Sequence, residues 1–232
     1  PTFKLTLPLM FLALLWFGGI KELFKNKLFI LSLAVLAIFA GLSVNETFKG
    51  TSEERFLRLN IFSDINLQQS IIQKINEERN LSTLPNILRP VFYNKPLEYS
   101  RTLLENYIEN ISPDFLYLRG DRNPRHNPGE WGMLYLIELP LLLAGLYYLG
   151  KNEKKKLILL ISWILIVPVA TMFLGQTHAL RNNFMISPLI LISACALSNL
   201  PKVLARLSVA AIFIQLIFVL VAVYFYVPVK FT

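Results

Sequence analysis

Six apolar runs separated by polar turns fill most of this chain, and one long polar segment interrupts them. The runs cover about 5–20, 28–44, 133–149, 157–174, 182–198 and 207–227. Most approach the roughly 17–25 residues that a helix needs to cross the hydrocarbon core of a membrane. We predict an all-α polytopic membrane protein with about six transmembrane helices, because backbone polar groups in lipid must pair within their own segment.

The polar segment divides the chain into three parts. We expect two transmembrane helices in 1–44, an extracytoplasmic insert of mixed helix and loop in 45–132, and four transmembrane helices in 133–232. The chain begins with Pro1, and its first apolar run ends in a basic turn without a signal-peptide cleavage pattern. We therefore interpret 1–44 as the tail of a larger N-terminal transmembrane region.

The distribution of charge assigns a side to each part. The chain carries a net charge of +8, although residues 45–132 are nearly neutral. Most of the excess lies in three short turns on one side of the predicted helices: Lys21, Lys25 and Lys27; Lys151, Lys154, Lys155 and Lys156; and Lys202 with Arg206. The positive-inside rule places these turns in the cytoplasm, and the insert and the turn 175–181 outside. Because the excess follows topology, no nucleic-acid partner is expected.

The insert has the pattern of an ordered segment. Asp64 is a suitable N-cap for a helix over 66–79. A second helix is predicted over 97–110, with an apolar stripe at helical spacing formed by Leu103, Leu104, Tyr107, Ile108 and Ile111. Residues 114–132 mix aromatic, glycine, proline and charged residues, and we predict a structured loop there rather than a helix.

Glu138 is the most unusual ionisable residue of the apolar runs. It lies about two turns into the third run, and Pro140 follows it where a kink could open a polar pocket. A carboxylate at the centre of a transmembrane helix costs roughly 2.5–3.5 kcal/mol on insertion scales, which calls for a partner. Glu138 is either a pocket-lining carboxylate that positions a substrate or one half of a structural ion pair.

His178 and Arg181 lie in the outer turn before the fifth run. A helix N-terminus with an arginine beside it suits a phosphate, since the guanidinium can bind two oxygens. The plainer interpretation is an arginine lying among lipid headgroups, with His178 as an ordinary turn residue. A second group, formed by Asp121, Arg122, Arg125 and His126, is either an anion site or a solvated charged loop. The single cysteine, Cys195, allows neither an internal disulfide nor a cysteine metal site, and no cofactor is expected.

Several motifs taken together resemble bacterial membrane glycosyltransferases of the GT-C superfamily, close to the protein O-mannosyltransferase and aminoarabinose-transferase type. They are Ser112-Pro113-Asp114-Phe115-Leu116-Tyr117-Leu118-Arg119-Gly120-Asp121, Arg125-His126, Gly132-Met133-Leu134-Tyr135, Glu138-Leu139-Pro140, and an H-x-x-R turn at His178-Ala179-Leu180-Arg181. The resemblance covers about 45–197. It implies an enzyme of the bacterial plasma membrane that takes a sugar from a polyprenyl-phosphate carrier and transfers it to a glycan, lipid or protein acceptor outside.

The resemblance also implies roles for individual residues. His178 and Arg181 would belong to the donor-phosphate region, whereas Asp121, Arg125, His126 and Glu138 would be pocket or structural residues. The catalytic acid of such enzymes lies in an early external loop, which we expect upstream of Pro1. Two other functions stay open on the sequence alone: a polymerase or ligase of O-antigen type, and a membrane transport or assembly subunit without enzymatic activity.

Overall fold

The computed structural model describes residues 2–18, 24–25, 27–48, 60–121, 127, 131–174 and 178–226. Within these residues all regular structure is helical, which confirms the helical fold class. The N-terminal part contains α1 (Thr2–Gly18) and α3 (Lys27–Phe48), so that α3 extends past the predicted end at 44. The C-terminal part contains α8 (Glu138–Asn152), α9 (Lys154–Thr171) followed by η2 (Met172–Leu174), α10 (Ala179–Asn199), and α11 (Lys202–Val221) followed by η3 (Ala222–Tyr226).

Within the described residues, three helical segments are long and apolar enough to cross a membrane, and they indicate a membrane protein. They are Lys154–Leu174, Ala179–Asn199 and Lys202–Phe225. The helices α1 and α8 are shorter, with 17 and 15 residues. At 1.5 Å per residue α8 extends about 22 Å, less than the roughly 30 Å of a hydrocarbon core. The count of six spans therefore stays a prediction.

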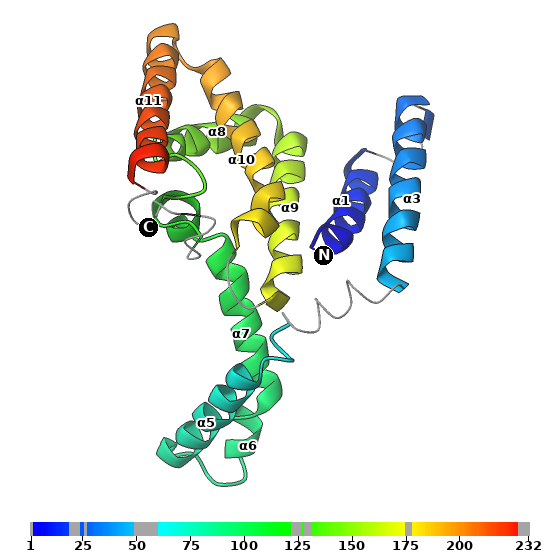
Figure 1. Ribbon diagram of the computed structural model, residues 1–232, viewed down its shortest axis with the longest axis vertical. Coiled ribbons are helices and arrows are strands. Elements are labelled where there is room, and N and C mark those ends of the chain that lie inside the picture. Colours follow the sequence, from blue (N-terminus) through cyan, green and yellow to red (C-terminus); the bar gives the residue numbers. More distant parts are fainter. Residues whose placement is uncertain are drawn as a thin grey trace.

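The polar insert and the basic turns lie at opposite ends of the helical bundle. Figure 1 draws the α8–α9 and α10–α11 turns at one end, whereas α5 and α6 project from the other. The lysines of residues 151–156 and Lys202 therefore lie far from the insert. This separation agrees with the arrangement that the charge distribution predicts, in which one end is basic and the other carries the insert.

The two helices predicted for the insert are both present. In α5 (Ile65–Leu81), the Asp64 carboxylate accepts hydrogen bonds from the N–H groups of Asn66 and Leu67, which confirms the predicted N-cap. The second helix, α7 (Lys95–Asn110), is capped by Asn94 and begins two residues before the predicted start. Pro96 is tolerated there because a helix does not use the N–H groups of its first turn.

Between them lies the short helix α6 (Arg89–Phe92). The apolar stripe predicted for α7 divides between two environments. Leu104 and Ile108 are exposed, whereas Ile111 packs against the buried core of the bundle.

The structure corrects the prediction of a loop over 114–132 for its first five residues, and residues 122–126 and 128–130 lie outside the described part of the chain. Residues Asp114–Leu118 form the π-helix η1, in which the Arg119 N–H donates to the Asp114 carbonyl oxygen at 2.7 Å. Phe115, Leu116 and Tyr117 are buried there, in a cluster with residues of α9 and α10: Val167, Met185 and Leu189. The glycines and prolines nearby suggested a loop, but burial of three consecutive large side chains against the bundle stabilises a helical turn instead.

The structure also corrects the start of the third apolar run. The helix α8 begins at Glu138 rather than at Met133, because the preceding residues pair with η1: the Leu134 N–H donates to the Leu116 carbonyl oxygen at 2.8 Å. Glu138 is therefore the first residue of the helix and does not lie two turns inside it. Pro140 is the third residue of the helix, in the first turn, where a proline interrupts no hydrogen bond of the helix.

The helices α8 and α10 pack closely against each other. Gly145 of α8 is buried, and a Cβ atom at this position would collide with the Ile192 carbonyl oxygen of α10. The helix α1 packs against α9. In contrast, none of the described residues of α11 is buried, as expected for a helix that faces lipid.

Candidate functional site

Asp121, at the end of the insert, lies against the start of α10. Its Oδ2 atom accepts a hydrogen bond of 2.8 Å from the Ala179 N–H, across 58 residues of sequence. Gly120 makes this approach possible because its φ of 68° lies in the left-handed region, which favours glycine. The Asp121 carboxylate thereby satisfies one of the N–H groups that a helix N-terminus leaves without an internal partner.

His178 meets the same carboxylate. As the residue before α10 it has an extended backbone, and its Nδ1 atom lies 3.9 Å from Asp121 Oδ2. The Asp121 side chain is 1% exposed and the His178 side chain 21% exposed, so water reaches the pair from the histidine side. The structure therefore brings together two predicted site residues, one from the insert and one from the outer turn.

Arg181 adds a cation to the same turn. Its backbone N–H donates to the His178 carbonyl oxygen at 3.1 Å, and its Nη1 atom lies 3.4 Å from the Leu174 carbonyl oxygen at the end of η2. The structure changes one part of the anion site predicted at this helix N-terminus. The Ala179 N–H already serves the Asp121 carboxylate, so an anion would meet the side chains of Arg181 and His178 rather than this amide.

A buried group of amides that sequence reasoning missed lies one turn further along α10. Asn182 donates through Nδ2 to the Oδ1 atom of Asn110 in α7, and the Thr171 hydroxyl of α9 lies 3.2 Å from Asn182 Oδ1. All three side chains are buried. The available signal was Asn182 itself, since an amide at the start of an apolar run is costly without a partner.

The other predicted site residues are distributed differently. Glu138 lies at the start of α8 beside Tyr117, whose hydroxyl is buried in the core cluster. Burial, and secondly the charge of Glu138, raise the pKa of Tyr117 to about 12, so this hydroxyl keeps its proton at physiological pH. Arg125 and His126, together with Arg122, lie outside the described residues.

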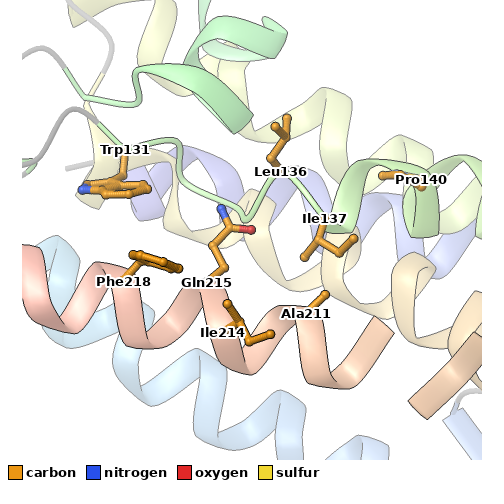
Figure 2. Close-up of a pocket in the computed structure, with 8 residues that line it drawn as sticks. All are labelled: Trp131, Leu136, Ile137, Pro140, Ala211, Ile214, Gln215 and Phe218. Carbon is orange, nitrogen blue, oxygen red and sulfur yellow. The ribbon is translucent and has the colours of Figure 1, made fainter. Parts of the chain in front are cut away.

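An apolar groove lies between α11 and the start of α8 (Figure 2). Its volume is about 540 Å³, and its lining consists of Trp131, Leu136, Ile137, Pro140, Ala211, Ile214, Gln215 and Phe218. Gln215 is the single amide in this lining, and Figure 2 shows its head directed between Trp131 and Leu136. Such a lining suits a hydrocarbon chain with one polar group.

Trp131 connects the groove to the Asp121–His178 contact. The side chain of Asn127 donates to the carbonyl oxygens of Arg119 and Trp131, and so holds the two ends of this loop together. Gly120 lies so close that a Cβ atom there would collide with the Trp131 carbonyl oxygen. The groove therefore begins next to the residues that position Asp121.

Among the described residues, no group of three His, Cys, Asp or Glu side chains is arranged to hold a metal ion. Neither a protein-family model, nor a curated protein, nor a solved structure matches this chain.

Proposed function

We propose that this chain is part of an integral membrane glycosyltransferase, which moves a sugar from a polyprenyl-phosphate donor to an acceptor on the extracytoplasmic face. The contact between Asp121 and His178 is the observation that carries the proposal. The two segments that resemble GT-C enzymes most, 112–121 and 178–181, are distant in sequence and meet at one end of the bundle. Their adjacency is what a shared reaction site requires.

The arrangement of cation and groove supports a lipid-linked donor. Arg181 and His178 lie at the end of the spans, where the phosphate of a membrane-anchored carrier would lie, and the groove beside Trp131 has the lining for its hydrocarbon chain. A guanidinium binds two phosphate oxygens in a fixed geometry. It would stabilise the carrier phosphate as that group leaves the sugar and develops negative charge.

The proposal includes the finer features that the sequence suggests. The six spans, the bacterial plasma membrane and the outer location of the insert belong to it. Glu138, Arg125 and His126 are assigned to the pocket or its support. Membrane lipid, the lipid-linked sugar and a glycan, lipid or protein acceptor are the proposed partners.

Transfer of a labelled sugar from a polyprenyl-phosphate carrier, measured with the intact protein in proteoliposomes, tests this function. Arg181→Ala is expected to lower the rate by roughly 100-fold, as for loss of one donor that stabilises developing charge, with normal folded yield. Arg206→Ala is the matched control, because Arg206 lies near the start of α11 at the opposite end, and its rate should stay unchanged.

Equal rates for Arg181→Ala and the unaltered protein would contradict the assigned role of Arg181. Two other results would replace the proposed function. Joining of lipid-linked glycan repeats into longer chains would favour a polymerase or ligase, and uptake of labelled solute without transfer would favour transport.

A further inference from the structure

A closed ring of hydrogen bonds joins α7, α10 and α9 next to the outer turn. Asn182 of α10 donates to Asn110 Oδ1, and Asn110 Nδ2 donates to the Asn106 carbonyl oxygen at 2.6 Å. The Asn106 side chain donates to the Met172 carbonyl oxygen at 3.0 Å. The peptide bond between Met172 and Thr171 and the contact from Thr171 back to Asn182 close the ring.

Burial makes this ring specific for one arrangement of the three helices. Asn110, Thr171 and Asn182 are each 1% exposed, so water cannot replace a broken partner. A buried amide that loses its partner is strongly unfavourable, whereas a leucine in the same place would tolerate several rotations of its helix. The ring therefore selects one rotation of α10 about its own axis.

That rotation also decides where the outer turn points. Asn182 follows His178 by four residues, which places both on the same face of α10, and the Asn182 N–H donates to the His178 carbonyl oxygen at 3.1 Å. Turning Asn182 away from Asn110 would turn His178 away from Asp121 and move Arg181 with it. The amide pair and the Asp121–His178 contact thus report the same rotation.

We propose that Asn110 and Asn182 are positioning residues, which fix the rotation of the first turn of α10 so that His178 faces Asp121 and Arg181 lies beside the Leu174 carbonyl oxygen. The importance of this for catalysis rests on the proposed glycosyl transfer. The positioning itself is a property of the fold, and it can be measured without any substrate.

The test measures the rotation of α10 in the double variant Asn110→Leu/Asn182→Leu and in the unaltered protein. Removing both partners together leaves no buried amide without a bond, so this variant should fold. Spin labels at positions 97 and 180, both exposed, report the distance from α7 to the start of α10 after Cys195→Ser removes the single native cysteine. Freedom of about 60° on a helix of roughly 5–6 Å radius would broaden the distance distribution by roughly 5 Å.

Asn199→Leu is the matched control, because Asn199 lies at the opposite end of α10 and donates to the Cys195 carbonyl oxygen outside the ring. Its distribution should equal that of the unaltered chain. An unbroadened distribution in the double variant would overturn the proposal. Should that variant not fold, Asn110→Leu alone decides, since it removes the bond between Asn110 and Asn182 and leaves Asn182 Oδ1 its contact with the Thr171 hydroxyl. Broadening in Asn110→Leu supports the proposal, and an unchanged distribution refutes it.

Kinetics of the intact protein separate positioning from simple support of the fold. With thermal stability unchanged, the double variant should lose at least roughly 100-fold in kcat, since a misplacement of only about 1 Å already costs that much, and KM for the donor should change less. A stable double variant with the normal kcat would contradict the positioning role. If the unaltered protein transfers no sugar, the proposed function fails, while the spin-label result still decides whether the ring sets the rotation.

Discussion

The two ends of the insert are stabilised in different ways. The distal arm is defined as α5 and α6 (residues 65–92), and its contacts join residues that are closer in sequence. Asp64 caps α5, and the arm contacts α7 through a 2.6 Å ion pair between Lys74 and Glu98. The junction, defined as residues 106–121 with residues 171–174 and 178–182, is ordered by pairs far apart in sequence. Asp121 and Ala179 are 58 residues apart, and Asn110 and Asn182 are 72 apart.

Exposure follows the same division. Leu81 and Ile87 both lie in the arm and are 83% and 86% exposed, whereas Asn110 and Asn182 in the junction are 1% exposed. Apolar side chains face water in the arm, and polar side chains are buried in the junction. This inversion indicates that the junction is built for one defined geometry, and that changes in the arm should have local effects.

Gly120→Val should have the largest effect on this contrast. Valine disfavours the positive φ at this position, and its Cβ atom would strike the Trp131 carbonyl oxygen, so the residue before Asp121 could not hold its conformation. We expect a loss of more than ~3 kcal/mol in the free energy of unfolding, combining backbone strain with a steric clash. Chemical denaturation in detergent measures it. A near-normal unfolding midpoint would show that the turn at Gly120 is not needed for the junction.

Asp121→Ala should have the second largest effect. It removes the buried acceptor for the Ala179 N–H and the partner of the partly exposed His178, for a loss of about 2 kcal/mol. Asp114→Ala is the control. Asp114 is partly exposed and forms a surface ion pair of 3.5 Å with the exposed Arg119, so this substitution should cost about 0.5 kcal/mol or less. Equal losses for the two aspartates would remove the distinction drawn for Asp121.

Asp64→Ala tests whether a change in the arm leaves the junction unaffected. Loss of this N-cap should destabilise α5 by about 1 kcal/mol. Hydrogen exchange resolved by segment should show faster exchange in α5 and unchanged exchange at the start of α10. Faster exchange in both places would mean that the arm and the junction unfold together, contrary to the division described.

Ile87→Ser should have the smallest effect. The side chain is 86% exposed, so its replacement by a polar residue removes almost no packing, and the free energy of unfolding should change by less than about 0.5 kcal/mol. Ile75→Ser, at a buried position of α5, serves as the contrasting variant and should be clearly less stable. A large loss with Ile87→Ser would reveal packing on the arm that the fold does not show.

An element could be predicted from the sequence when residues close to it in the chain determine it. The helix α5 could be located because its cap, Asp64, acts within three residues, and α7 because its apolar residues recur at helical spacing. The start of α8 could not, since it depends on Leu134 pairing with Leu116 in a π-helix that the local composition concealed. The site followed the same rule: His178 and Asp121 were candidates by residue type, but the amide pair of Asn110 and Asn182 becomes visible only when α7 and α10 are placed together.

The length of α7 sets how far the arm reaches from the bundle. Its 16 residues extend about 24 Å. A lipid headgroup layer is only about 5–8 Å thick on each side of the membrane. Figure 1 shows α7 running from the bundle toward α5 and α6, so the arm extends well past the ends of the membrane helices. A molecule that touches the tip of the arm must approach from solution, whereas one that touches Arg181 can arrive by diffusing in the plane of the bilayer.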